Sequence, residues 1–258
     1  TTDIYTLSLH DALPILDVSR ETQPELDWAQ RALGTAVASA AGLGFFIPSD
    51  IMPALLTHLV ELASWNEAAG LTGKLSPEET GEQLLLDSVL PALIWPGTKA
   101  DTLCDIGSGN GFPAIPLALV WKIEAGLLYE SRAKKAWFLQ RALRNSGLSG
   151  YKVIRKQWRK GDPLSVQSLI TSKAALTPEI ILGAAARYDS KALLYLGPSA
   201  KKEDVLRISN ELGLHTSLVE LELPISRVYR RYVLAWKNSS QEDETSQSPE
   251  AYSKQESE

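Results

Sequence analysis

Apolar residues recur at a helical spacing in the first third of the chain and gather into short runs in the remainder. The helical spacing predicts three helices, over about residues 24–44, 49–69 and 77–90. The third begins with Ser76-Pro77-Glu78-Glu79, which combines a capping serine, a proline at the first helical position and an acidic first turn. The N-terminal part of the chain is therefore expected to be helical.

Short apolar runs bounded by turn residues predict strands in the rest of the chain. The expected strands cover residues 102–105, 126–129, 151–155, 166–171, 192–196, 216–221 and 229–236. Two helices are expected between them, at 114–121 and from Ser131, its expected cap, to Gly147 at its left-handed end. Alternating strands and helices predict an α/β fold with a doubly wound, mostly parallel sheet. The last strand follows Pro224 and is expected to form an antiparallel edge pair.

The residues most informative about function are those from Asp105 to Pro113, which read Asp-Ile-Gly-Ser-Gly-Asn-Gly-Phe-Pro. They lie between an expected strand and an expected helix, the context of nucleotide-binding turns. The glycine spacing differs from the dinucleotide fingerprint, which would need a glycine in place of Phe112. No lysine or arginine lies inside the turn to bind phosphate. The turn therefore favours a cofactor without phosphates, such as S-adenosylmethionine; the alternative is that the glycines only shape a bend.

A second informative residue is Glu130, which ends the second expected strand 25 residues after Asp105. Ligands of open α/β sheets bind outside the carboxyl ends of the strands, so Glu130 and the glycine turn are expected to face one crevice. A carboxylate at this position can accept hydrogen bonds from both hydroxyls of a ribose. The alternative role is to place negative charge at the N-terminus of the next helix, and both roles are compatible.

Composition is that of a soluble globular protein of 258 residues, 44% apolar, which is long enough to bury a core. The single cysteine excludes internal disulfides and fits a reducing cytoplasm. No apolar run reaches the length of a membrane span. We accordingly expect a cytoplasmic monomer that has neither a membrane nor a metal partner.

The two ends of the chain differ from its middle. Residues 1–16 resemble a translated cloning adapter and are left out of the fold prediction, and residues 1–48 are interpreted as an N-terminal extension. Residues 238–258 carry six acids and one base, which accounts for the whole net charge of −5, and this tail is expected to be disordered. The remaining residues, 49–237, are predicted to form one domain.

Positive charge is concentrated between residues 132 and 160, where ten bases stand without an acid. The ten are Arg132, Lys134, Lys135, Arg141, Arg144, Lys152, Arg155, Lys156, Arg159 and Lys160. Such a cluster favours a phosphate-rich partner such as a nucleic acid. The alternative is a solvated helix face. Among nearby aromatic residues, Trp158 is interpreted as a base-stacking residue and Trp137 as part of the core.

Four segments of the chain are informative in combination. They are Trp65-Asn66-x4-Leu71-Thr72-Gly73, Leu86-Asp87-Ser88, the glycine turn with Ile115-Pro116-Leu117-Ala118, and Glu130-Ser131-x2-Lys134-Lys135-x2-Phe138-Leu139. Together they resemble the RsmG (GidB) family. Members of that family are S-adenosylmethionine-dependent methyltransferases that modify N7 of a guanine in small-subunit (16S) ribosomal RNA. The resemblance covers about residues 50–237 and implies a class I methyltransferase, Rossmann-like sheet with N-terminal helices beside the cofactor crevice.

The residues and the resemblance together imply two sets of binding residues. The expected cofactor contacts are Asp105, Gly107, Gly109, Gly111, Phe112, Glu130, Trp158, Arg159 and Lys173. The expected RNA contacts are Lys134, Lys135, Arg141, Arg144 and Lys156. No catalytic residue and no metal ligand is identified.

The chain also departs from the family pattern at several polar positions. Leu84 replaces a histidine, Ala114 a glycine, Leu196 a lysine and Lys173 an arginine, and an expected acid near Arg159 is missing. Lysine keeps the charge of arginine but loses its planar, bidentate geometry. The cofactor turn is thus preserved, whereas catalytic turnover is left open.

The chemistry of the methyl acceptor is narrowed by the residues that the chain lacks. Guanine N7 carries a lone pair and no proton, so methyl transfer to it requires positioning rather than a general base. The three histidines, His10, His58 and His215, are expected to lie away from the glycine turn and to be structural or exposed. Cys104 lies within an expected buried strand, where a thiol is inert. Without a general base or a reactive thiol in the expected site, a ring nitrogen is favoured as the methyl acceptor.

The sequence therefore predicts a methyltransferase of small-subunit ribosomal RNA that uses S-adenosylmethionine, with ribosomal RNA or the small ribosomal subunit as its partner. Two alternatives stay open. One is a diverged methyltransferase of a small molecule, and the other is a non-catalytic RNA-binding protein on the same fold.

Overall fold

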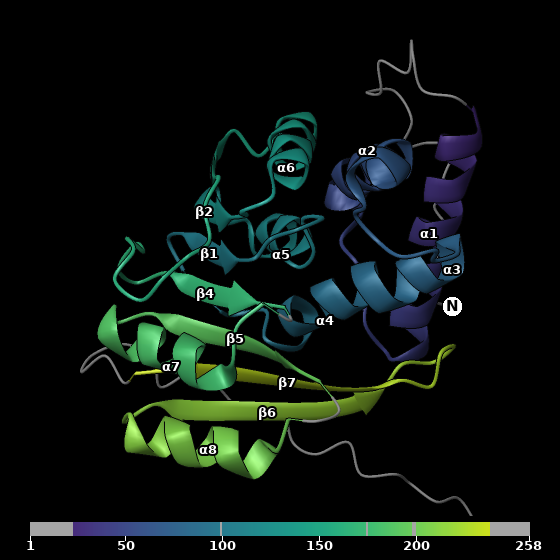
Figure 1. The fold of residues 1–258 in the computed structure, drawn as a ribbon. Helices are drawn as coiled ribbons and strands as arrows, with labels where there is room; N and C mark the ends of the chain where they lie inside the picture. Colours follow the sequence, from purple (N-terminus) through teal and green to yellow (C-terminus); the bar gives the residue numbers. More distant parts are fainter. Residues whose placement is uncertain (1–22, 99, 174, 198–199, 238–258) are drawn as a thin grey trace, which may run out of the picture.

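The computed structural model describes residues 23–98, 100–173, 175–197 and 200–237. Within them, seven strands form one sheet in the order β3-β2-β1-β4-β5-β7-β6 (Figure 1). The strands are β1 (Leu103–Ile106), β2 (Ala125–Tyr129), β3 (Gly150–Ile154), β4 (Leu169–Ser172), β5 (Lys191–Leu196), β6 (His215–Glu222) and β7 (Tyr229–Trp236). Strands β1 to β5 pair in parallel, and β7 is antiparallel to both β5 and β6. The predicted doubly wound sheet and its antiparallel final pair are confirmed.

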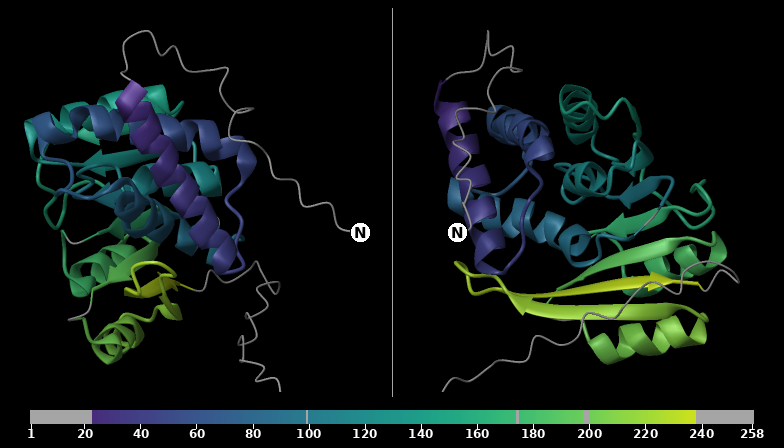
Figure 2. Two further views of the ribbon diagram at one scale, coloured as in Figure 1. Left: turned by 90° about the vertical axis from the view of Figure 1, so that its right-hand side faces the viewer. Right: turned by 180° about the vertical axis from the view of Figure 1, so that it is seen from behind.

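Helices cover both faces of this sheet. They are α1 (Gln23–Gly42), η2 (Ser49–Ile51), α2 (Met52–Ala69), α3 (Pro77–Thr80), η3 (Gly81–Leu86), α4 (Asp87–Ile94), α5 (Ala114–Trp121), α6 (Ala133–Asn145), α7 (Pro178–Arg187) and α8 (Lys202–Glu211). Helices α7 and α8 pack on one face, and α4, α5 and α6 pack on the other, where α1 and α2 add a further layer (Figure 2).

Residues of β1 show how the sheet separates its two cores. Leu103 belongs to the core beneath the N-terminal helices, whereas Cys104 belongs to the core beneath α7 and α8. All four residues of the strand are buried, as expected for a parallel strand covered on both faces. The expected burial of Cys104 is confirmed, and burial raises the pKa of its thiol.

The third predicted helix is longer than its pattern indicated. Ser76 and Glu79 form the expected capping box, in which each side chain accepts the other residue's backbone N–H. Segments α3, η3 and α4 then follow one another without a break to Ile94, and η3 is π-helical. The continuous helix carries two buried acids, Glu82 and Asp87, toward the centre of the molecule.

Two predicted boundaries are wrong for local reasons. Ser131 does not cap α6; the cap is Arg132, whose N–H is bound by the Glu130 carboxylate at 2.7 Å. The fourth strand begins at Leu169 rather than Val166, because Val166 is 67% exposed and Gln167 adopts a left-handed φ of 53°. The expected left-handed residue after α6 is confirmed, since Gly147 has a φ of 80°.

Three further expectations concern the ends of the chain. The adapter-like residues 1–16 and the acidic tail 238–258 lie outside the described residues, and the proposed division of the chain into an extension and a domain stays a prediction. Helix α1 packs against α2 and η3 through Ala29, Ala32 and Ala36, which are fully buried. Across the described residues, every helix is too short or too polar to span a bilayer.

Candidate functional site

The glycine turn joins β1 to α5 and is tied to the neighbouring strand β2. The backbone N–H groups of Gly107 and Ser108 both donate to the carbonyl of Tyr129, at 2.8 and 3.0 Å. The Ser108 hydroxyl donates to the carbonyl of Asp105 at 3.1 Å. These bonds fix the turn at the carboxyl edge of the sheet, where its remaining N–H groups can meet a ligand.

Two of the glycines are required by close contacts as well as by backbone conformation. Gly107 has a φ of 80°, and a Cβ there would lie 2.3 Å from the Cβ of Ala175. Gly111 has a φ of 83°, and a Cβ there would lie 2.9 Å from Nε2 of His58. A side chain at either position would therefore displace a neighbour in addition to straining the backbone.

His58 contradicts the expectation that no histidine lies near the turn. Its Nε2 is 2.9 Å from the Asn110 carbonyl, and its ring centroid is 4.5 Å from that of Phe112. The side chain is fully buried, and burial lowers the pKa of His58 to about 4 although the bond to Asn110 opposes the shift. His58 is therefore a neutral residue that supports the turn from below. His215 is exposed at the start of β6, and His10 lies outside the described residues.

Asp105, the penultimate residue of β1, has a buried carboxylate. Among the described residues, neither of its carboxylate oxygens has a hydrogen-bond partner. Burial raises the pKa of Asp105 to about 7; the Ser108 side chain opposes this shift, the Glu130 carboxylate adds to it, and the positive charge of Lys173 opposes it. A buried acid without a partner is costly for the fold unless a positively charged or donating group reaches it. The acid expected before the glycine turn is therefore present and buried, and its contact with a cofactor stays a prediction.

These two buried groups predict opposite dependences of stability on pH. His58 has its pKa lowered from 6.5 to about 4, so its contribution to stability is present above pH 6.5 and is lost as the pH falls toward 4. Asp105 has its pKa raised from 3.8 to about 7, so stability falls as the pH rises between these values. Because the two pH ranges overlap, the slope expected from one group opposes the slope expected from the other.

The variant Asp105→Asn should remove the decrease in stability with rising pH that is expected from Asp105. Its free energy of unfolding, measured in urea, is expected to increase by about 3 kcal/mol relative to the natural protein as the pH rises from 4 to 7. Parallel curves for the two proteins would show that Asp105 is ionised alike in the folded and unfolded states.

Glu130 lies beside the turn and is 7% exposed. Its Oε2 accepts the N–H of Gly109 at 3.1 Å, and its Oε1 accepts the N–H of Arg132 at 2.7 Å. The carboxylate thus stabilises the start of α6, as one of the two expected roles requires. Each oxygen retains a further lone pair, and the ribose role stays a prediction.

A cavity of about 220 Å³ opens over the glycine turn. Its lining consists of Leu71, Leu84, Gly107, Ser108, Gly109, Asn110, Phe112, Lys135 and Lys173. Five of these residues belong to the turn, and Leu84 comes from the N-terminal helices. The cavity therefore lies where both the glycine spacing and the sheet topology predict a ligand.

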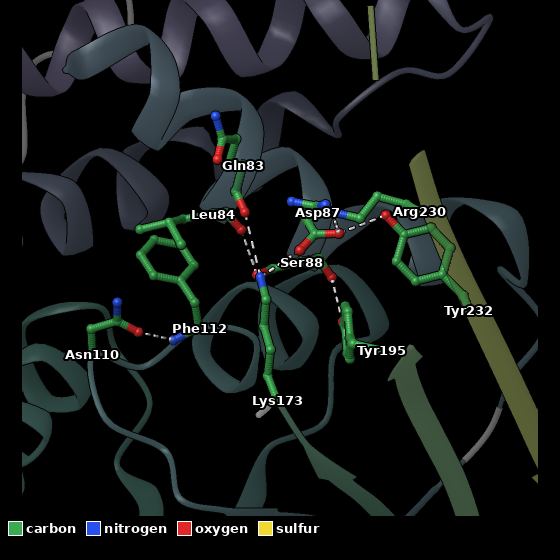
Figure 3. A network of polar contacts seen from close by, with 10 residues as sticks. All are labelled: Gln83, Leu84, Asp87, Ser88, Asn110, Phe112, Lys173, Tyr195, Arg230 and Tyr232. Atoms are coloured by element: carbon green, nitrogen blue, oxygen red, sulfur yellow. Dashed lines mark hydrogen bonds and ion pairs between the residues drawn. The ribbon is translucent and has the colours of Figure 1, made fainter. Parts of the chain in front are cut away.

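Lys173, which lines the cavity, belongs to a largely buried ionic network centred on Asp87 (Figure 3). Asp87 is 1% exposed. Its carboxylate forms one ion pair with Lys173 Nζ at 2.5 Å and another with Arg230 Nε at 3.0 Å. The Tyr232 hydroxyl donates to the same carboxylate at 2.8 Å, and Lys173 also lies over the Tyr195 ring. Asp87 was part of the motif that carried the resemblance, yet its partners come from distant strands, so its role was missed.

The basic residues of the 132–160 segment are partly neutralised by acids from elsewhere in the chain. Arg141 Nε lies 2.6 Å from Glu61 of α2, and Lys156 lies 2.6 Å from Asp162. Lys134 donates to the carbonyl of Ala68 at 3.1 Å. The assignment of Lys134, Lys135, Arg141, Arg144 and Lys156 to RNA binding stays a prediction.

The burial of the two tryptophans is the reverse of what the sequence predicted. Trp158 is 5% exposed and packs with Tyr129 and Leu164 beneath the sheet, so its stacking on an RNA base is contradicted. Trp137 is 59% exposed on α6, so its placement in the core is wrong. Its neighbour Phe138 is fully buried instead. Any cofactor contact of Trp158 or Arg159 stays a prediction.

The departures from the family pattern lie at different places. Leu84 lines the cavity, whereas Ala114 is buried at the start of α5 and Leu196 is buried at the end of β5. Lys173 lines the cavity and holds Asp87 at the same time. The substitution of Leu84 is thus the one that removes a polar side chain from the cavity wall.

The sheet order, the glycine turn after β1 and the acid directly after β2 are those of the class I methyltransferase fold. Two solved structures of low sequence identity share the fold. Magnesium protoporphyrin IX methyltransferase from Synechocystis PCC 6803 with bound SAM has a TM-score of 0.51 at 18% identity, covering 67% of this chain and 89% of that one. A putative O-methyltransferase from Klebsiella pneumoniae has a TM-score of 0.51 at 17% identity, covering 82% and 99%.

Sequence comparison identifies the family. Residues 51–205 match the GidB family, described as rRNA small subunit methyltransferase G. Ribosomal RNA small subunit methyltransferase G of Solibacter usitatus is 36% identical over 179 residues, which cover 66% of this chain and 82% of that protein. The protein of the same name from Dichelobacter nodosus is 38% identical over 130 residues, and the match spans 49% of this chain and 61% of that protein. The chain belongs to this family, and the resemblance read from its motifs is confirmed.

Proposed function

We propose that the protein transfers a methyl group from S-adenosylmethionine to N7 of a guanine in small-subunit ribosomal RNA. The observation that carries the proposal is the cavity over the glycine turn, with the buried carboxylates of Asp105 and Glu130 close to that turn, in a chain of this family. The printed names of the relatives, all ribosomal RNA small subunit methyltransferase G, support the choice of RNA as substrate.

The residues around the cavity fit this cofactor. Asp105 is a buried acid without a partner and suits the ammonium of the cofactor's amino-acid end. Glu130 retains lone pairs for ribose hydroxyls, and the glycine turn lacks the side chains that would fill the cradle. When bound, S-adenosylmethionine supplies the activated methyl group. The turn itself contains no lysine or arginine, and the two cations of the cavity wall, Lys135 and Lys173, come from other segments.

The protein's own contribution to the reaction is mainly positioning. The turn is tied to β2, and Asp87 holds Lys173 at the cavity wall, so the groups facing a guanine are fixed before it arrives. The nearest histidine, His58, is buried and hydrogen-bonded beneath the turn rather than facing the cavity. This arrangement suits an acceptor nitrogen that has no proton to lose.

The test is methyl transfer to RNA that lacks the modification. Small ribosomal subunits from a host strain in which the gene has been deleted are incubated with the purified protein and methyl-labelled donor, and 7-methylguanine is mapped by chemical strand cleavage. We expect a new cleavage site in the 16S RNA. Donor binding without any RNA product would contradict the proposed substrate and favour a small-molecule acceptor or a non-catalytic role.

We also propose that the protein acts as a monomer in the cytoplasm. The single cysteine supports a reducing compartment. Light scattering of the full chain is expected to give the mass of one chain, and a dimer mass would contradict this part of the proposal.

A further inference from the structure

The outer surface of α6 carries a row of exposed side chains. Lys134, Trp137, Arg141 and Arg144 are all exposed, and their spacing of three, four and three residues places them along one face of the helix. The row extends for about 15 Å along the helix axis. We call these four residues the α6 stripe. The α6 stripe contains no acid, because no aspartate or glutamate occurs between residues 132 and 160.

Trp137 is the unusual member of the α6 stripe. A tryptophan that is 59% exposed leaves much apolar surface in water, where a buried position would be favoured. Its ring lies 5.3 Å from that of Trp65 on α2, with the two planes tilted by 55°. Trp65 is itself half-buried and lies under the Arg141 guanidinium at 5.9 Å. One side of the Trp137 ring therefore contacts Trp65, and the remainder of the ring is exposed to solvent.

The surroundings of Trp137 are held rigidly. Arg141 is fixed by Glu61, which is 1% exposed, and Asn145 of the same helix also contacts Glu61. Lys134 is anchored to the carbonyl of Ala68 at the end of α2. Glu61 offsets the charge of Arg141, so the positive character of the stripe comes mainly from Lys134 and Arg144.

The helix that carries the stripe also contributes one residue to the wall of the cavity over the glycine turn. Lys135, the residue after the first member of the stripe, lines that cavity, and Trp137 follows two residues later. The helix begins where Glu130 binds the N–H of Arg132, so its first turn belongs to the site itself. Lys135 and Trp137 are two residues apart and so point to different sides of the helix, and the stripe is connected to the cavity through α6 itself.

We propose that Trp137 stacks against an unpaired base of the RNA substrate, while Lys134 and Arg144 contact phosphates on either side of it. This inference rests on the proposed function and adds the surface that holds the RNA. Aromatic rings receive splayed-out bases by stacking, and flanking cations bind the backbone. A single exposed ring between like charges suits RNA better than an apolar protein surface, because the charges would be costly to bury without acids opposite.

The first experiment compares RNA affinity in three variants by fluorescence anisotropy with a labelled single-stranded fragment of 16S RNA. Trp137→Ala is expected to weaken binding about tenfold, because loss of one stacked base has an effect of this order. Trp137→Phe should retain most of the affinity, since it keeps an aromatic face. The matched control is Phe46→Ala, which removes another highly exposed aromatic residue, 80% accessible and far from α6 in the sequence.

The second experiment separates stacking from charge. Arg144→Gln is expected to reduce the slope of log affinity against log salt by about 0.7, the value for one phosphate contact on a single strand. Trp137→Ala should leave that slope unchanged. An unchanged RNA affinity in Trp137→Ala, or a loss as large in Phe46→Ala, would overturn the inference. A shift in oligomeric state with unchanged RNA affinity would overturn it too.

Failure of this inference is distinguishable from failure of the proposed function. Methyl transfer to 16S RNA by the natural protein tests the function alone. If that transfer occurs and Trp137→Ala binds RNA as the natural protein does, the function stands and the stacking surface is wrong. Donor affinity, measured separately, is expected to be the same in all stripe variants, because none of the substituted residues lines the cavity.

Discussion

Replacing Asp87 by asparagine is expected to lower the free energy of unfolding by about 3–5 kcal/mol, the typical cost of removing one partner from a buried ion pair. Asp87 is 1% exposed and binds two cations, Lys173 at 2.5 Å and Arg230 at 3.0 Å. An asparagine would leave both positive charges without their anion in a setting that is poor in water. Urea denaturation at neutral pH would measure the loss.

Two comparisons give this prediction its controls. The double variant Asp87→Asn/Lys173→Met removes one of the stranded cations and should recover part of the lost stability. The matched single variant is Asp50→Asn, whose carboxylate is 60% exposed and pairs with Lys122 at 3.3 Å on the surface. That substitution should have little effect, because exposed ion pairs contribute little. Equal losses in Asp87→Asn and Asp50→Asn would show that the buried network does not stabilise the fold.

The second large effect is expected from Glu130→Ala, which should weaken binding of S-adenosylmethionine by at least about tenfold, or about 1.4 kcal/mol. The carboxylate orients the N–H of Gly109 within the turn and has lone pairs left for ribose hydroxyls. Its loss would remove the ligand's hydrogen-bond acceptor and release the turn as well. Isothermal titration calorimetry would give the two affinities directly.

The control for this variant is Glu124→Ala. Glu124 is an exposed acid just before β2, at the opposite end of the strand from Glu130. Its replacement changes the net charge equally but lies far from the turn, so donor affinity should be unaffected. If both variants bound the donor as the natural protein does, the ribose role of Glu130 would be excluded.

The sequence was sufficient for the parts of the fold that depend on local patterns. Strands β1 and β7 and the capping box at Ser76 were predicted within one residue, because apolar runs and cap chemistry are set by neighbouring residues. The glycine turn was recognisable because its function constrains consecutive positions. The cavity that the turn borders was therefore also predictable in outline.

Contacts between distant segments were not predictable in this way. The position of Trp137 depends on which face of α6 meets α2, and that of Trp158 on how the chain folds back beneath β2. Both tryptophans stand among similar basic neighbours in the sequence, so their local surroundings do not separate an exposed residue from a buried one. Glu61 likewise pairs with Arg141 across 80 residues. The support of the turn by His58 is a further long-range contact of this kind.

The most direct test of the central claim is equilibrium dialysis of the full chain against methyl-labelled S-adenosylmethionine. A cradle formed by the glycine turn, Asp105 and Glu130 predicts saturable binding of one donor molecule per chain, abolished by an excess of the unlabelled compound. Absence of saturable binding at donor concentrations on the order of 1 mM, where even a weak site of about 4 kcal/mol would be half filled, would contradict the account.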